Sequence, residues 1–255
     1  MRMTSLHDTP DTPGADLAPD PSRRRLTGAA LGGAALLLLP GLALRPAWAA
    51  TSPGEALAAA LATAMAGPGG TANAAHAANA ASSATGRVLM LRHALAPGTF
   101  DPPGFRLGDC STQRNLDDEG RRQAREIGAW MAERRLRPTR VRSSPWCRCV
   151  DTAQLAFAGD PAVDVWPALG SPHAGDAAAN ARALDDLRKG LREAMQRASG
   201  FEVWVTHNFV FSDFLGASAD VGAGVLLGLD AQGAPQVRLR VGGDTFARTA
   251  GVGRG

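Results

Sequence analysis

The sequence predicts an α/β fold in which a mostly parallel sheet is covered by helices on both faces and carries an antiparallel edge. Short apolar runs of strand length alternate with amphipathic segments along residues 87–245, which is typical of a parallel sheet with crossover helices. Two last apolar runs, 224–229 and 236–241, are separated by one short turn and indicate the antiparallel edge. Apolar residues make up 45% of the 255 residues, which is enough for a full core.

The elements of residues 87–245 are expected in the following order. The expected strands before the closing pair cover residues 88–91, 140–142, 163–166 and 201–206. The expected helices, with apolar residues at helical spacing, cover residues 117–135, 145–157 and 178–198. Asp117 supplies a cap for the first helix, and Pro145 suits the first turn of the second. A long polar loop, residues 94–116, follows the first strand.

Residues 1–49 have the features of an export signal. The run SRRRLT at 22–27 precedes a weakly apolar stretch, 28–44, and the small-x-small sequence AWA ends at residue 49. We expect a cleaved signal peptide of the twin-arginine type and a periplasmic or secreted mature protein. The alternative is an uncleaved membrane anchor, which Pro40 and the glycines of this stretch disfavour. We therefore expect no stable membrane span after cleavage.

The remaining segments outside the main domain are rich in small residues. Residues 50–86 are expected to form an alanine-rich helix over 55–65 and a linker over 67–86. Residues 246–255 are expected to be a flexible tail. The domain itself is then expected to span residues 87–245.

Three cysteines fall within this domain. In an oxidising compartment a disulfide persists, and Cys147 and Cys149 are too close in sequence to pair easily. A bridge from Cys110 to Cys147 or to Cys149 is therefore expected, with the other cysteine free. A zinc site is the competing interpretation, but the sequence contains no CxxC pair to support it.

The charge pattern limits the choice of partners. The formal net charge is +3, and Lys189 is the single lysine, so arginine supplies nearly all positive charge. Arginine suits phosphate and carboxylate ligands, although codon bias gives the same enrichment. No basic run is interleaved with aromatic residues, so the sequence gives no indication of nucleic-acid binding.

Polar residues follow the buried strands where an α/β sheet places its chemistry. His93 and His207 each come directly after an apolar run, and Arg92 precedes His93. Ser143 and Ser144 end another strand, and Arg148 falls in the first turn of the next helix. The carboxyl ends of parallel strands meet at one edge of the sheet. Two arginines, a helix N-terminus and two histidines there would bind a phosphate dianion and keep one histidine unprotonated as a nucleophile.

These residues resemble the motifs of the histidine phosphatase superfamily, which includes phosphoglycerate mutases and the phosphohistidine phosphatase SixA. The motifs are Leu91-Arg92-His93-Ala94, Ser144-Pro145 with Arg148 and Thr152-Ala153, and Val205-Thr206-His207-Asn208. They occur in the family's order over residues 87–215. The segment Gln113-Arg114-Asn115-Leu116, followed by Gly120, is also similar to the family's sequence after its first motif.

The resemblance implies a phosphoglycerate mutase-like three-layer α/β/α sandwich and a mechanism without metal or cofactor. His93 would attack phosphorus and form a phosphohistidine, while Arg92 and Arg148 neutralise the phosphoryl oxygens. His207 would hydrogen-bond the transferring group. The residues expected to contact the substrate are Arg92, Arg148, Arg114 and Asn208. For Arg114, a surface position beside the following helix is the alternative interpretation.

The sequence departs from the family pattern in two respects, namely the residue after Arg92-His93 and the general acid. Ala94 stands where the family has glycine, and no glutamate occurs over residues 169–173, where the mutase-like branch has its general acid. Asn208 replaces the aspartate of the acid-phosphatase branch. The remaining candidate acids are Asp109, His173 and Asp176. A missing strong acid favours substrates with good leaving groups, such as phosphohistidine. In this respect the sequence resembles SixA-like enzymes.

The sequence as a whole indicates a phosphatase that acts on a small phosphomonoester or phosphoramidate. A catalytically inactive protein that only binds phosphate is the first alternative, but it would not need both His93 and His207. A phosphoglycerate-type mutase is the second alternative. It is disfavoured because an exported protein would not meet phosphoglycerates.

Overall fold

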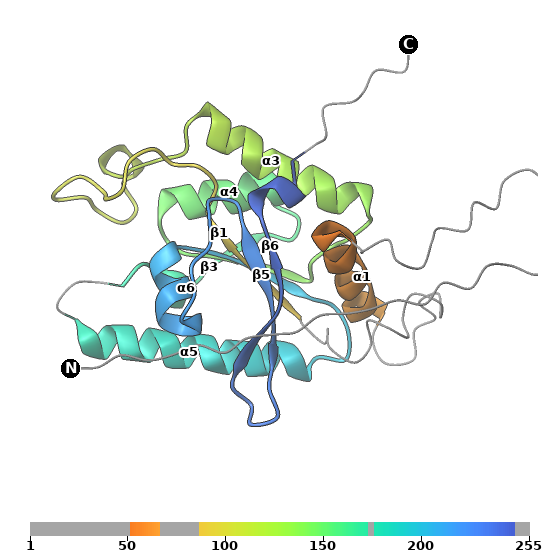
Figure 1. Ribbon diagram of the computed structural model, residues 1–255. Coiled ribbons are helices and arrows are strands. Elements are labelled where there is room, and N and C mark those ends of the chain that lie inside the picture. The colour runs from red at the N-terminus through yellow and green to blue at the C-terminus, as the bar shows by residue number, and fades with distance from the viewer. Residues whose placement is uncertain (1–51, 67–86, 173–175, 248–255) are drawn as a thin grey trace, which may run out of the picture. The chain divides into compact units, whose positions relative to one another are not determined.

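A single six-stranded sheet forms the centre of the computed structural model, which describes residues 52–66, 87–172 and 176–247 (Figure 1). The strands are β1 (Val88–Arg92), β2 (Arg140–Ser143), β3 (Val163–Val165), β4 (Glu202–Thr206), β5 (Gly224–Leu229) and β6 (Pro235–Val241). Their order across the sheet is β3-β2-β4-β1-β5-β6. The pairs β3–β2, β2–β4 and β4–β1 are parallel, whereas β1–β5 and β5–β6 are antiparallel. The mostly parallel sheet with an antiparallel edge is confirmed.

Helices cover both faces of this sheet, which gives the expected three layers (Figure 1). The helices are α1 (Pro53–Ala66), α3 (Asp118–Glu133), α4 (Cys147–Phe157), α5 (Ala177–Gln196) and α6 (Asn208–Leu215). Short 3-10 turns occur at η1 (Cys110–Thr112), η2 (Pro167–Leu169) and η3 (Gly243–Thr245). Alternate residues of β1 and β4 point to opposite faces. Leu89 and Val203 therefore pack with α1, α3 and α4, whereas Met90 and Trp204 pack with α5 and α6.

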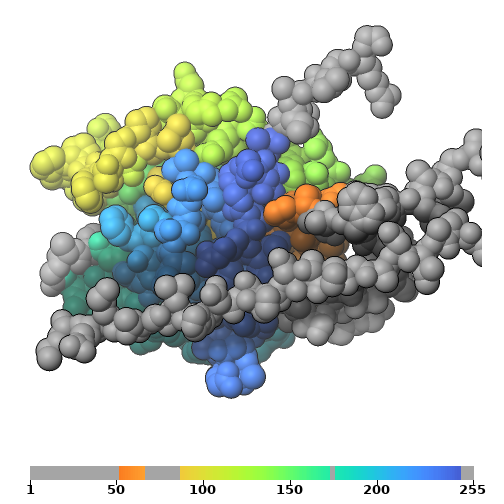
Figure 2. All heavy atoms as spheres, in the orientation of Figure 1, coloured from red at the N-terminus to blue at the C-terminus, as the bar shows by residue number. Residues whose placement is uncertain are grey.

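Helix α1 packs into the same core as the sheet, although it precedes the region 87–245. Leu57 and Leu61 are fully buried in the cluster that also holds Trp130 and Phe246. In the space-filling view α1, in orange, lies directly against the blue C-terminal segment (Figure 2). The helix expected over residues 55–65 is therefore present and adds to the core of the domain.

Helix α6 is the element that the sequence did not predict. Its eight residues are too few for helical periodicity to stand out from the apolar run around it. Val210, Phe211 and Phe214 are buried against the α5 side of the sheet. Helix α6 begins directly after His207, so the chain turns at the end of β4 as it does after β2.

Several expected segments lie outside the described residues. These are the signal sequence over residues 1–49, the linker over 67–86 and residues 248–255 of the expected tail. In the described ranges, no helix combines the length and the apolar character that a membrane span requires.

Candidate active site

The two central strands place His93 and His207 side by side. Strands β1 and β4 are parallel neighbours, and their last pair in register is Arg92 with Thr206. Each histidine is the next residue of its strand, and the His93 amide donates to the Thr206 carbonyl at 2.9 Å. The two rings meet edge to face with centroids 5.5 Å apart, and both residues are 2% exposed. The expected meeting of the two histidines at one sheet edge is observed.

The hydrogen bond of His93 determines which ring nitrogen is free. Its Nδ1 lies 2.7 Å from the carbonyl oxygen of Ala94. A carbonyl accepts only, so Nδ1 carries the hydrogen and Nε2 keeps its lone pair in the neutral ring. Burial lowers the pKa of His93 to about 3; the hydrogen bond to Ala94 opposes this shift and the guanidinium groups of Arg148 and Arg92 add to it. His93 is therefore an unprotonated potential nucleophile at neutral pH.

His207 is held by partners on α4 and at the end of β2. Its Nδ1 lies 3.2 Å from Nη2 of Arg148, and its Nε2 lies 2.7 Å from Oγ of Ser144. A guanidinium donates only, so Nδ1 accepts from Arg148 and Nε2 donates to Ser144. Burial and the charge of Arg148 hold the pKa of His207 well below its usual value. This fixes the orientation of both Arg148 and the imidazole.

A cavity of about 240 Å³ opens at this edge and brings most of the expected site residues together. Its lining includes the six residues Arg92, His93, Arg114, Arg148, His207 and Asn208. Arg92 donates to the Ala219 carbonyl at 2.9 Å, and Arg114 donates to the Gly98 carbonyl at 2.8 Å. Burial lowers the pKa of Arg92 and of Arg114. Arg114 is thus a cavity residue rather than a surface residue, and three guanidinium groups surround one small space.

Asp101 is the site residue that the sequence did not reveal. It lines the cavity, and its side chain is 9% exposed. Its carboxylate accepts from Nη1 of Arg148 at 2.9 Å, from Nε1 of Trp146 at 3.0 Å and from the Arg114 amide at 2.9 Å. It lies within the long loop after β1, where neither periodicity nor a motif marks a residue. The sequence Asp-Pro-Pro, which begins with Asp101 itself and is typical of a turn, is the one local signal.

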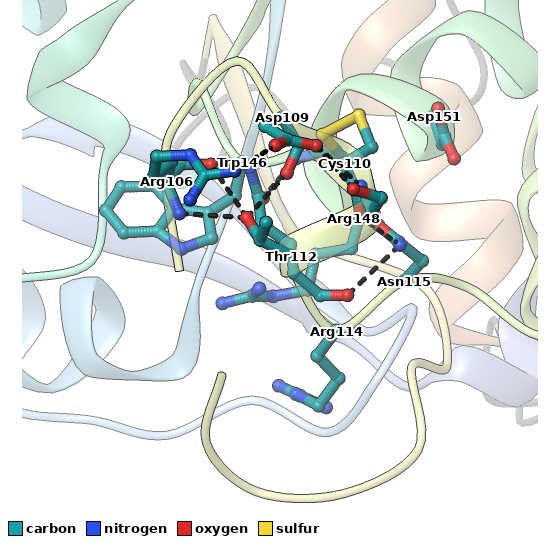
Figure 3. Close-up of a disulfide and its surroundings, with 12 residues drawn as sticks. Arg106, Asp109, Cys110, Thr112, Arg114, Asn115, Trp146, Arg148 and Asp151 are labelled. Carbon is teal, nitrogen blue, oxygen red and sulfur yellow. Dashed lines mark hydrogen bonds and ion pairs between the residues drawn. A yellow bond between two sulfur atoms is a disulfide. The ribbon is translucent and has the colours of Figure 1, made fainter. Parts of the chain in front are cut away.

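The expected candidate acids do not share this position. Asp109 does not line the cavity: it pairs with Arg106 at 2.6 Å and accepts from the Ser111 amide, which caps η1 (Figure 3). Hydrogen bonds from Ser111 and Arg106 lower the pKa of Asp109, which opposes a role as a proton donor. Asp176 caps α5 through the Ala179 amide. His173 lies outside the described residues.

The segment after His93 is fixed by polar ties and by one close backbone approach. Oγ1 of Thr152 accepts from the Ala94 amide at 3.1 Å and donates to the Arg148 carbonyl at 2.6 Å. A side-chain carbon on Gly120 would lie 1.9 Å from the Leu95 carbonyl oxygen, so only glycine lets α3 approach this closely. These contacts explain why Thr152 and Gly120 accompany the histidine motif.

A disulfide joins the long loop to the start of α4 (Figure 3). Cys110 and Cys147 are bonded, with their Cα atoms 5.7 Å apart. Of the two expected pairings, the structure thus has the one to Cys147. Cys149 is a buried free thiol 3.5 Å from Nε2 of His207, and burial raises its pKa to about 12. The bridge reaches the residue directly before Arg148.

Comparisons with known proteins agree with the motifs. Residues 88–206 match the family model described as histidine phosphatase superfamily (branch 1). No curated protein matches the chain.

Three solved structures are similar to part of this chain. The protein histidine phosphatase SixA complexed with tungstate is 17% identical, with 63% of this chain and 99% of that chain covered and a TM-score of 0.47. The phosphoserine phosphatase of Entamoeba histolytica in complex with 3-phosphoglyceric acid is 13% identical, with coverages of 63% and 99% and a TM-score of 0.49. The alpha-ribazole phosphatase of Shigella flexneri is 15% identical, with coverages of 62% and 96% and a TM-score of 0.46. The family match identifies residues 88–206 as a domain of the histidine phosphatase superfamily, branch 1.

Proposed function

We propose that this protein is a metal-independent phosphatase that hydrolyses a small phosphomonoester or phosphoramidate through a phosphohistidine on His93. One observation carries the proposal: Nε2 of a buried, neutral His93 is left with its lone pair beside a cavity that three arginines line. The family match supports phosphatase chemistry.

In the first step Nε2 of His93 attacks phosphorus. The new N–P bond forms as the bond to the leaving group breaks, and the bonding pair departs with the leaving group. In the second step water attacks the phosphohistidine, the N–P bond breaks, and inorganic phosphate leaves with Nε2 restored. Phosphoryl transfer needs mainly positioning and charge neutralisation, and we assign both to the guanidinium groups of Arg92, Arg114 and Arg148.

His207 acts on the transferring group after it gains a proton. Without ligand its pKa is depressed by burial and by Arg148. A phosphate dianion in the cavity raises that pKa, because a nearby negative charge favours the imidazolium. In this step a phosphoryl oxygen takes the place of Nη2 of Arg148 at Nδ1 of His207, and the doubly protonated ring donates to that oxygen through Nδ1 while Nε2 keeps its bond to Ser144. The positive charge of the ring counts most where negative charge increases during transfer.

The contacts of the Asp101 carboxylate favour a substrate whose leaving group departs without a strong acid. Asp101 already accepts hydrogen bonds from Arg148, Trp146 and the Arg114 amide. We therefore assign it the positioning of Arg148 rather than proton donation, which favours a phosphoramidate or an ester of an acidic hydroxyl, as in the SixA-like branch.

The test is turnover of p-nitrophenyl phosphate in the presence of EDTA, with His93→Ala as the variant and exposed Lys189→Ala as the control. We expect turnover in EDTA for the wild type and the control, and none for His93→Ala. A sample quenched in alkaline denaturant, in which the N–P bond of phosphohistidine survives, should carry phosphate on the peptide containing His93. Binding of vanadate without turnover would indicate the inactive phosphate-binding protein, and unchanged turnover in His93→Ala would refute the mechanism.

We also propose export by the twin-arginine route to the periplasm or the exterior. The double arginine near residue 23 and the cleavage pattern at 47–49 support it, and so does the disulfide, since such bonds persist outside the cytoplasm. Expression with both Arg23 and Arg24 changed to lysine tests the route. The protein should then stay in the cytoplasm uncleaved, whereas the unchanged chain should be exported with its N-terminus at Ala50.

A further inference from the structure

An aromatic groove continues from the phosphate cavity. It is a cavity of about 720 Å³ whose lining includes Phe100, Phe105, Trp146 and Phe209. Phe100 and Phe209 line both the groove and the smaller cavity, so the two spaces adjoin at these rings. A volume of this size is in the range that holds a small organic ligand.

The rings of the groove differ in how they are held. Trp146 is 3% exposed, donates to Asp101 and lies 5.9 Å from the Phe105 ring. Phe100 and Phe209 are 74% and 52% exposed, which makes them the two most exposed large apolar side chains of the described residues. Both side chains line the same groove, and exposed apolar side chains that gather at a groove are typical of a ligand-binding site. A fixed aromatic wall with two uncovered rings at the phosphate entrance is an arrangement that suits a flat apolar ligand.

The charges of the groove restrict that ligand further. Asp213 lines the groove, Asp101 lines both the groove and the phosphate cavity, and the three arginines line the phosphate cavity but not the groove. A carboxylate on the leaving group of the substrate would therefore meet negative charge in the groove, which disfavours substrates that resemble phosphoglycerates. The absence of a strong acid among the described residues of the site also favours a phenolic oxygen as the leaving atom, since a phenol, with a pKa of about 10, departs as its anion far more readily than an aliphatic alcohol does.

We propose that the aromatic groove binds the leaving group, and that the substrates are phosphate monoesters of small aromatic rings without further acidic groups. This inference rests on the proposed function and names its substrate class. His93 forms the N–P bond as the bond from phosphorus to the ring oxygen breaks, and the phenolate takes the bonding pair. Phe100 and Phe209 are then specificity-determining residues that contact the ring.

The test uses non-hydrolysable phosphonates, which separate ring binding from leaving-group reactivity. Dissociation constants of benzylphosphonate and methylphosphonate are measured by calorimetry, with inorganic phosphate as a reference. For the wild type we expect benzylphosphonate to bind at least about tenfold more tightly than methylphosphonate, as burial of one phenyl ring implies. Adding a carboxylate to the benzyl ring should reduce this advantage.

The variants locate the effect. In the double variant Phe100→Ala/Phe209→Ala, the ratio of the dissociation constants of methylphosphonate and benzylphosphonate should fall to near one. Because both ligands carry the same phosphonate group, this ratio cancels any general change in phosphate affinity. Val165→Ala, which also truncates an exposed apolar side chain but lies outside the groove, should keep the wild-type ratio. Equal binding of both phosphonates by a wild type that binds phosphate would overturn this inference and leave the proposed function intact. If the wild type binds neither phosphonate nor phosphate, both fail.

Discussion

Removal of the disulfide should destabilise the domain by an amount that the loop length determines. The bridge between Cys110 and Cys147 spans 37 residues. In the chain-entropy model a closed loop of this length lowers the entropy of the unfolded chain by about 13 cal/mol/K, or about 4 kcal/mol at 25 °C. We take this as the expected loss in the variant Cys110→Ser with Cys147→Ala. For a domain of this size, it corresponds to a fall in Tm of about 8–16 °C.

The assay is urea unfolding of the oxidised wild type, the wild type in dithiothreitol and the double variant. The last two should unfold at the same lower urea concentration, and dithiothreitol should not shift the variant. Alanine at position 147 avoids placing a hydroxyl in a buried site, since Cys147 is 6% exposed. Coincident unfolding curves for the oxidised wild type and the double variant would refute the reasoning, because the bridge would then leave the unfolded chain unconstrained.

Three further predictions follow from the site. Lowering the pH from 8 to 5 should reduce the free energy of unfolding by about 2 kcal/mol through His93 alone, because the pKa of this histidine is about 6.5 in the unfolded chain and about 3 in the folded one. In urea unfolding, the His93→Gln variant should lack this part of the dependence of stability on pH. A thiol reagent should label no cysteine in the native oxidised protein and one, Cys149, after denaturation, whereas native labelling would contradict its burial. Asp101→Asn should bind inorganic phosphate more tightly, because a negative charge is removed from the cavity. Its kcat should fall about tenfold, because the uncharged amide holds Arg148 less firmly than the carboxylate does. Weaker phosphate binding in calorimetry would contradict this prediction.

The parts of the fold that the sequence predicted are those with a strong local pattern. The buried run of β4 and the amphipathic α5 could be recognised, because burial on both faces and helical spacing leave distinct signatures. Helix α6 could not, since its eight residues complete barely two turns. The packing of α1 against the core is also not encoded locally, because an alanine-rich helix shows no strong apolar face and gains its place from the sheet beside it.

The site divides in the same way. His93, His207 and Arg148 follow strands or begin a helix, so the fold class alone brings them together. Asp101 belongs to a long loop whose path depends on its contacts with Arg148 and Trp146, and no periodicity reports such a path. The choice of Cys147 as the partner of Cys110 likewise depends on how that loop folds back.

The register of β1 against β4 has a consequence for how this domain tolerates changes in length. Arg92 pairs with Thr206, and the two histidines follow as the next residue of each strand. One inserted residue in either strand would turn its histidine to the other face of the sheet and separate the pair, because side chains alternate along a strand. Insertions in residues 97–109 leave that pairing intact while they reshape the groove wall that Phe100 and Phe105 form. A change in loop length alone can thus admit substrates with other leaving groups, while His93 and His207 keep their positions.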